Sequence, residues 1–268
     1  MILSSPPLPS VWLSAAAALV YAVTALGAER LSLPRARALL LLAWVLHACT
    51  LALGLLETPA RFGFAPALSM TAWLVLTVYA VESQVYPQLR ARWPLAGLGT
   101  LAVLLPLAFP GAPLHPSASA WLPLHLALGL ASYGLFGAAV VHAALMTRAE
   151  RLMREGAGAS VGLPLLTLER LTFRFVQAGF VLLTATLIAG LFFGEQLYGA
   201  SLAHWKWDHK TIFSLLAWLT FAVLLAGRAR LGWRGRRAVR VLYIGAGLLL
   251  LAYAGSRFVL EVVLGRAP

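Results

Sequence analysis

Residues 173–194 read FRFVQAGFVLLTATLIAGLFFG, and after Arg174 this stretch contains no charged side chain. A helix needs about 20 mostly apolar residues to cross a bilayer, so the stretch predicts a membrane-spanning helix. Seven other stretches are similar, the fourth of them short and proline-containing, which gives eight predicted spans: residues 11–28, 37–56, 66–84, 94–110, 121–147, 173–194, 211–227 and 239–260. The sequence therefore predicts an all-α, polytopic integral membrane bundle, with one transmembrane domain over residues 1–268.

The composition agrees with a membrane protein. Hydrophobic residues make up 61% of the chain and charged residues only 11%, against about 25% charged in ordinary soluble domains. The net charge of +12 sits in short arginine-rich connections, which indicates membrane topology rather than nucleic-acid binding. The single cysteine, Cys49, excludes an intramolecular disulfide, and without C-x-x-C-H the chain is not itself a c-type cytochrome. The segment before the first span has no positive charge, so we expect a retained first helix rather than a signal peptide.

The basic residues predict the orientation of the spans. Sixteen of the 21 fall in alternate connections: Arg30, Arg35, Arg37, Arg90, Arg92, Arg148, Arg151, Arg154, Arg170, Arg174, Arg228, Arg230, Arg234, Arg236, Arg237 and Arg240. The positive-inside rule assigns these connections to the cytoplasm. With eight spans, both termini then lie on the outer side of the membrane. The stretch HWKWDHK, residues 204–210, also faces outward, at the level of the beginning of the fifth span.

Three histidines fall within predicted spans, where ionisable groups are costly and usually face a cavity or a partner. His47 lies near the middle of the second span and is either a hydrogen-bonded core residue or a functional one. His125 and His142 lie 17 positions apart on the fifth span, about 25 Å at 1.5 Å per residue. They cannot share a small ligand. We expect His142 at the cytoplasmic interface and His125 at the outer surface, level with HWKWDHK.

HWKWDHK is the most polar and aromatic stretch between two spans. Trp205 and Trp207 can be interpreted as anchors at the membrane–water interface, and Asp208 can be interpreted as a helix cap. If the segment is extended, however, the two indoles point the same way and form a flat apolar platform. A flat macrocycle such as haem would use such a platform, with histidine nitrogens as axial ligands to iron. The local candidates are His125, His204 and His209.

The sequence resembles the CcsA/CcmC family of haem-handling membrane proteins, and specifically its YpjD branch of cytochrome c assembly proteins. The tryptophan-rich motif of that family matches Trp205, Trp207, Asp208, Lys210, Leu215 and Trp218. Further similarity lies in LLTATLIAGLFF, WDHKTIFSLLAW, GWRGRRAV and LLAYAGSRFV, and HLALGLASYGLF is similar to the family helix that opens with an external histidine. The resemblance covers most of the chain and is most specific in its last third.

The resemblance implies a helical bundle that binds haem b in the membrane and presents it to apocytochrome c at the outer surface. His125 then matches an external haem ligand, His47 a histidine of an inner haem site, and Trp205, Trp207, Asp208 and Trp218 the haem-facing motif. The family's second external histidine should fall near residues 257–264, which read RFVLEVVL. Since no histidine is present there, His204 and His209 are the candidates to replace it.

These features leave two function classes open. The first is a haem-binding protein of the bacterial cytoplasmic (inner) membrane that handles and transfers haem rather than performing classical catalysis. The second is a regulatory or scaffold membrane protein that keeps the fold, no longer handles haem and acts through a protein partner. Besides the lipid bilayer, the expected partners are apocytochrome c or another membrane protein, and no nucleic acid.

Overall fold

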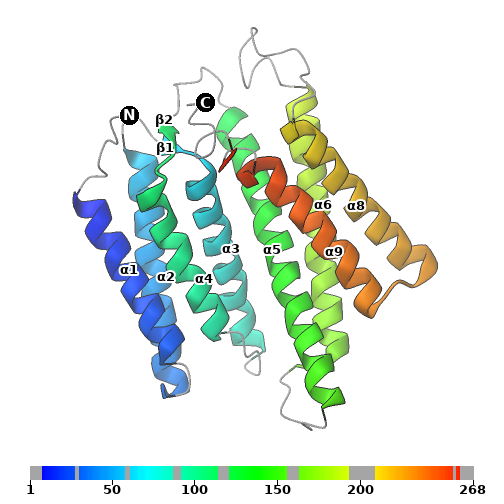
Figure 1. The fold of residues 1–268 in the computed structure, drawn as a ribbon, viewed down its shortest axis with the longest axis horizontal. Coiled ribbons are helices and arrows are strands. Elements are labelled where there is room, and N and C mark those ends of the chain that lie inside the picture. Colours follow the sequence, from blue (N-terminus) through cyan, green and yellow to red (C-terminus); the bar gives the residue numbers. More distant parts are fainter. Residues whose placement is uncertain are drawn as a thin grey trace. The chain divides into compact units, whose positions relative to one another are not determined.

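The computed structural model describes residues 8–27, 30–57, 61–86, 92–113, 121–155, 163–192, 209–255 and 258–259. The chain divides into two compact units, Met1–His115 with Gly265–Pro268 (unit 1) and Pro116–Leu264 (unit 2). Each unit is an antiparallel helical arrangement in which consecutive helices run up and down (Figure 1). The single transmembrane domain over residues 1–268 stays a prediction.

The described residues of unit 1 form the helices α1 (Leu8–Leu26), α2 (Leu33–Leu56), α3 (Phe64–Val85) and α4 (Arg92–Ala108). A short antiparallel pair, β1 (Arg61–Phe62) with β2 (Ala112–Pro113), ties the α2–α3 connection to the end of α4. Gly111 makes this pairing possible, because its φ is 79° and a Cβ there would lie 2.6 Å from the carbonyl of Phe62. The Arg61 guanidinium donates to the Gly111 carbonyl oxygen from Nε at 3.2 Å and Nη2 at 3.0 Å.

Unit 2 consists of α5 (Trp121–Arg154), α6 (Leu165–Phe192), α8 (His209–Leu231) and α9 (Gly235–Leu250), followed by a π-helical turn, η2 (Leu251–Gly255). Its core contains a stacked pair, Phe136 of α5 on Phe221 of α8, with ring centroids 3.8 Å apart. A Cβ at Gly245 of α9 would lie 2.7 Å from the Phe221 ring. The absence of a side chain there lets α9 pack closely on the phenyl pair.

The fold class predicted from the sequence is confirmed. In the described part of the chain, seven helices are long and apolar enough to cross a membrane, and α4 is a shorter apolar helix over Pro94–Ala108. Many large apolar side chains face outward, among them Leu19, Leu41, Leu101 and Val181 with exposed fractions of 59–69%, as expected for a surface in contact with lipid. The chain is therefore a polytopic integral membrane protein, and the fifth span continues into an arginine-containing extension that ends at Arg154.

Most of the described arginines of each unit gather at one end, which we call its arginine-rich end. In unit 1 this end is formed where α1 and α3 finish and α2 and α4 begin; in unit 2 it is formed where α5 and α8 finish and α6 and α9 begin. Among the described basic residues, Arg61 and Lys210 lie at the opposite ends of their units. Within each unit this separation follows the positive-inside pattern. The cytoplasmic location of the arginine-rich ends and the outer location of both termini stay predictions.

Candidate functional site

Half of the tryptophan-rich motif, Trp205, Trp207 and Asp208, lies outside the described residues. His204, Trp205, Trp207 and Asp208 precede the first described residue of α8, so their predicted roles stay predictions. His209 is the first residue of α8 and its side chain is exposed. The described part of the motif thus begins at the end of unit 2 that is opposite the arginine-rich end.

His125 lies at this same end of unit 2, near the beginning of α5, and is half-buried. Gly190 near the end of α6 faces it, since a Cβ there would lie 3.6 Å from His125 Cε1. The ammonium of Lys210, beside His209 on α8, is close enough to act electrostatically on the His125 imidazole. Residues of α5, α6 and α8 therefore meet near His125, and α8 contributes the positive charge of Lys210.

Aromatic residues and a π-helical turn adjoin this place. Lys210 Nζ lies 5.9 Å from the ring centroid of Tyr253, which belongs to η2. Tyr133 of α5 donates a 2.8 Å hydrogen bond to the carbonyl of Leu249, just before η2 begins. Single π-helical turns inside helices are frequent at functional sites. We name His125, Lys210 and Tyr253 the His125 cluster.

The described residues of the His125 cluster fit part of a haem site. An imidazole is a common axial ligand to haem iron, and an ammonium pairs with a carboxylate such as a haem propionate. Among the described residues, no group of three or more His, Cys, Asp and Glu side chains could hold a bare metal ion. The cluster suits one axial ligand of a macrocycle rather than an all-protein metal centre.

Trp218 is packed within unit 2 rather than at its end. Its Nε1 donates a 2.9 Å hydrogen bond to Thr184 Oγ1 on α6, and its ring stacks on Phe180 at 5.5 Å between centroids. Trp218 is nine residues beyond His209, which is about 13 Å along a helix. These contacts hold α8 against α6, and the predicted role of Trp218 toward haem stays a prediction.

His142, expected at the cytoplasmic interface, is enclosed by the protein. Its side chain is only 2% exposed, its Nδ1 donates a 2.8 Å hydrogen bond to the Ala138 carbonyl, and its ring lies 5.3 Å from that of Phe175 on α6. Burial against α6 does not test the depth of His142 in the membrane, so its interfacial location stays a prediction, whereas the apolar periodicity of α5 did not reveal which face α6 covers.

His47 is fully buried in the middle of unit 1 and contacts two other helices. Its Nε2 is 2.9 Å from Ser69 Oγ on α3, and its Nδ1 is 3.5 Å from the Tyr21 hydroxyl on α1. Ser69 and Tyr21 are themselves 1% and 0% exposed. We name Tyr21, His47 and Ser69 the buried trio. Iron ligation by His47 would require one ring nitrogen to give up its contact, and the longer one to Tyr21 would cost less.

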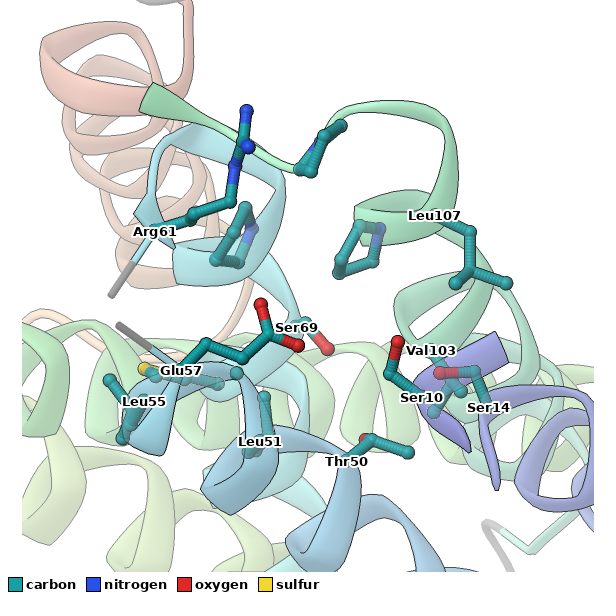
Figure 2. Close-up of a pocket in the computed structure, with 15 residues that line it drawn as sticks. Ser10, Ser14, Thr50, Leu51, Leu55, Glu57, Arg61, Ser69, Val103 and Leu107 are labelled. Carbon is teal, nitrogen blue, oxygen red and sulfur yellow. The ribbon is translucent and has the colours of Figure 1, made fainter. Parts of the chain in front are cut away.

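Two cavities enter unit 1 from its opposite ends and reach the buried trio. The first has a volume of about 100 Å³ and is lined by Ser69 together with polar residues of α1, α2 and the α2–α3 connection: Ser10, Ser14, Thr50, Glu57 and Arg61. Figure 2 shows the Glu57 carboxylate and the Ser69 hydroxyl pointing into the same space. The second, at the arginine-rich end, has a volume of about 210 Å³ and is lined by Tyr21, with Arg37, Tyr79, Ser83 and Gln84 among its polar residues.

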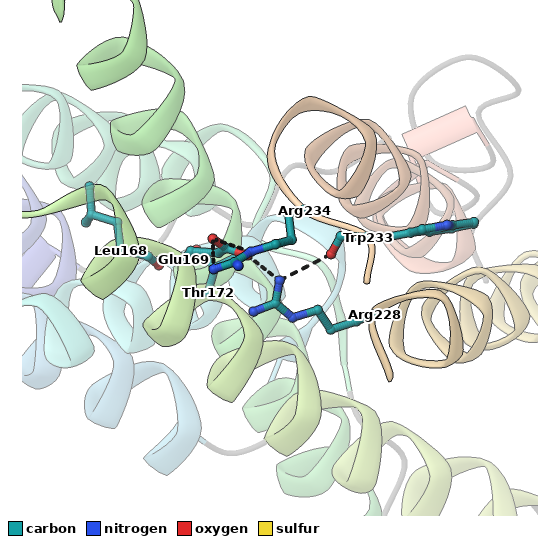
Figure 3. A network of polar contacts seen from close by, with 6 residues as sticks. All are labelled: Leu168, Glu169, Thr172, Arg228, Trp233 and Arg234. Atoms are coloured by element: carbon teal, nitrogen blue, oxygen red, sulfur yellow. Dashed lines mark hydrogen bonds and ion pairs between the residues drawn. The ribbon is translucent and has the colours of Figure 1, made fainter. Parts of the chain in front are cut away.

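A charge network that the sequence did not predict closes the arginine-rich end of unit 2 (Figure 3). Glu169 of α6 is 7% exposed and accepts from Arg228 of α8 and, at 2.9 Å, from Nε of Arg234 before α9. Arg228 also donates to the Trp233 carbonyl at 3.3 Å and lies 4.5 Å from the Phe173 ring centroid. The hydrogen bond that Arg234 donates to the Glu169 carboxylate raises the pKa of the Arg234 guanidinium. The sequence signal for this network was Glu169, an acidic residue within an arginine-rich connection.

Comparison with known proteins decides the family. A model of the family described as "Cytochrome C assembly protein" matches residues 33–264. The chain belongs to this cytochrome c assembly family. The resemblance predicted from the motifs is thereby confirmed.

Individual relatives agree with this assignment. The chain is 34% identical over 151 residues to "Inner membrane protein YpjD" of Escherichia coli (strain K12), a match that covers 56% of each protein. It is 30% identical over 221 residues to "Cytochrome c biogenesis protein CcsA" of Parasynechococcus marenigrum, covering 70% of this chain and 71% of the relative. The chain thus matches only about half the length of the Escherichia coli relative. No solved structure matches it significantly.

Proposed function

We propose that this protein binds haem b within the bacterial inner membrane and handles or presents it at the outer face. The observation that carries the proposal is the position of Lys210, two residues after Asp208 of the W-x-W-D segment and at the same end of unit 2 as His125. Membership of the cytochrome c assembly family supports it, as do relatives named inner membrane protein and cytochrome c biogenesis protein.

In this proposal the His125 imidazole is an axial ligand and the Lys210 ammonium pairs with a propionate. Trp205 and Trp207 provide the flat apolar surface, and Asp208 completes the segment. The second axial ligand is His204 or His209, and His209 is adjacent in sequence to Lys210. Haem supplies a redox-active iron when bound, while the chain's residues hold and orient it and limit its contact with water.

An inner haem ligand at His47 is a separate part of the proposal. The cavity at the arginine-rich end of unit 1 reaches Tyr21, which makes the longer of the two contacts with His47. Release of that contact would turn Nδ1 toward a ligand, and Arg37 at the same cavity could pair with a carboxylate. The partner of the protein is apocytochrome c or another membrane protein, and its task is transfer of haem rather than classical catalysis.

The test is the visible spectrum of the detergent-purified protein from haem-supplemented cells. We expect a Soret band, and His125→Ala should weaken haem binding about tenfold or more, as loss of metal-site groups does. His142→Ala is the matched control on the same helix and should leave the band unchanged. His47→Ala reports on the inner ligand. Absence of a Soret band in the unmodified protein would refute haem handling.

The second candidate is a regulatory or scaffold protein without haem. Two observations favour it: both ring nitrogens of His47 already contact protein side chains, and a charge network organises the arginine-rich end of unit 2. A surface of that kind suits an acidic partner protein. Co-purification of a stoichiometric partner with haem-free protein would support this candidate over the first.

A further inference from the structure

We propose that the outer face of α9 is a binding site for one anionic phospholipid. The headgroup phosphate would lie on Arg236 and Arg240, and an acyl chain would follow the exposed apolar residues beyond them. Both arginines are exposed, and they lie four residues apart on one face of the helix. This inference goes beyond the proposed function, because the lipid site contains none of the candidate haem ligands.

The connection between α8 and α9 fixes the position of the first turn of α9. A Cβ at Gly227 would lie 2.4 Å from the Trp233 ring, so the missing side chain lets the indole pack directly on α8. Arg234, the N-cap residue of α9, donates to the Glu169 carboxylate on α6 (Figure 3). Arg237 Cζ lies 4.2 Å from the centroid of the Trp233 ring. A site built on this turn is preorganised, which reduces the entropy lost when a ligand binds.

The arginines at the start of α9 carry positive charge that the described residues do not neutralise. Each described acidic residue of unit 2 is already paired with arginine: Glu150, Glu155 and Glu169. Within the described part of the chain, Arg236, Arg237 and Arg240 form no ion pair. An anionic group from outside the chain would complement this charge. A guanidinium suits a phosphodiester in particular, because it can donate two parallel N–H bonds to phosphate oxygens.

The same face of α9 becomes apolar beyond Arg240. Ile244 and Leu251 follow on it with exposed fractions of 59% and 48%, and a Cβ at Gly247 between them would meet no atom within 4 Å. Leu251 lies eleven residues after Arg240, which is about 16 Å along a helix. That length is close to half of the roughly 30 Å hydrocarbon core, which is the depth of one lipid leaflet.

This combination favours a lipid over an acidic protein. A soluble acidic partner could pair with Arg236 and Arg240, but it could not contact Ile244 or Leu251 at membrane depth. A phospholipid of the adjoining leaflet contacts both parts of the face at once. Its headgroup is expected to be anionic overall, because no described carboxylate lies free beside the arginines to pair with a cationic headgroup.

The test is native mass spectrometry of the full-length, detergent-purified protein mixed with phosphatidylglycerol or with phosphatidylcholine of the same acyl chains. We expect phosphatidylglycerol to bind more tightly, because phosphatidylcholine carries a cationic group beside its phosphate. Arg236→Gln combined with Arg240→Gln should lower phosphatidylglycerol binding about tenfold or more, since each arginine near an anionic headgroup contributes about fivefold. Binding of phosphatidylcholine should change much less.

Arg151→Gln combined with Arg154→Gln is the matched control. It removes the same charge at the same arginine-rich end, from arginines that pair with Glu155 and Glu150. Phosphatidylglycerol binding should therefore stay that of the unmodified protein. Equal binding of the two lipids, or an equal loss in the two double variants, would overturn the site. Loss of a co-purifying acidic protein from the α9 variant, with lipid binding unchanged, would also overturn it and assign the face to that protein.

Two further variants separate the headgroup from the acyl chain. Arg236→Lys combined with Arg240→Lys keeps the charge but not the paired N–H donors, so its phosphatidylglycerol binding should be intermediate. Ile244→Gln should weaken binding of both lipids, whereas Leu219→Gln, at a position 54% exposed on α8, should leave both unchanged. Equal effects of these two glutamine variants would refute the acyl-chain part. Thermal unfolding verifies that each variant is folded, and haem content, recorded separately, tests the proposed function.

Discussion

Unit 1 buries polar side chains in the middle of its helices, whereas the described charged contacts of unit 2 lie at its two ends. The buried trio consists of groups that can stay neutral, and it makes its contacts among α1, α2 and α3. In unit 2, Glu169 meets Arg228 at one end and Lys210 acts on His125 at the other. A charged group is less stable the farther it lies from water. Its position along the helix therefore determines whether a charged group or only a neutral polar group is tolerated there.

The same difference separates the two candidate haem ligands. A ligand must direct a ring nitrogen at iron, and at His47 this would break a contact inside the bundle. His125 is half-buried near a helix end, with Gly190 opposite and the beginning of α8 at the same end of the unit. A bound group can reach His125 without separating three packed helices. The predictions below test whether central polar groups support folding while terminal ones serve binding.

The largest effect is expected from His47→Ala. Removal of the imidazole leaves a cavity and deprives Ser69 and Tyr21 of a buried partner, so the free energy of unfolding should fall by about 2–4 kcal/mol. Thermal unfolding in detergent measures the loss. His209→Ala, at the exposed beginning of α8, is the control and should change stability little. Equal losses for the two variants would contradict the comparison.

Glu169→Gln should have the next largest effect. The substitution keeps the shape but removes the charge that faces Arg228, and we expect a loss of about 1–3 kcal/mol in unfolding free energy. Glu155→Gln is the matched control, because Glu155 is 54% exposed and pairs with Arg151 one turn away on the same helix. Exposed pairs of this kind contribute about 0.5 kcal/mol or less. If both variants lost the same amount, the Glu169 network would be no more than a surface ion pair.

Local features of the sequence were enough to predict the helices. The lengths of the hydrophobic stretches predicted the spans, and α5 continues beyond the predicted fifth span to Arg154. Contacts between distant residues were not predictable. Nothing local marks Ser69 and Tyr21 as partners of His47, and Glu169 is 59 residues from Arg228 and 65 from Arg234. Such pairs depend on how helices rotate against one another, which the apolar pattern of a membrane helix encodes weakly.

The candidate site could be predicted from the sequence only as far as a recognisable motif identifies its residues. Lys210 and Trp218 were identified by the resemblance to the family motif and His125 by its expected level with HWKWDHK, and His125 and Lys210 lie at the same end of unit 2. Trp218 belongs to the same motif but packs on Phe180 and Thr184. A motif therefore identifies residues that act in one region, without separating those that touch a ligand from those that support the helix.

A smaller effect is expected from Tyr133→Phe. The variant loses the hydrogen bond to the Leu249 carbonyl, which is worth about 1 kcal/mol, and the ring remains. Because Leu249 lies two residues before the start of η2, the change should appear as faster amide hydrogen exchange over residues 249–255. Exchange in α2 of the other unit is the internal reference. Unchanged exchange over residues 249–255 would mean that Tyr133 does not stabilise the π-helical turn.

The smallest effect is expected from Trp218→Phe, and it separates packing from haem contact within the motif. Phenylalanine can still stack on Phe180 but cannot donate to Thr184, so stability should fall by about 0.5–1 kcal/mol. In a background that already carries Thr184→Val, the same substitution should cost less, because the hydrogen bond is gone in both. The haem content of the purified protein should remain that of the unmodified chain. If haem is lost while stability is kept, Trp218 contacts the ligand as the motif implies, and the distinction between central support and terminal binding fails at this residue.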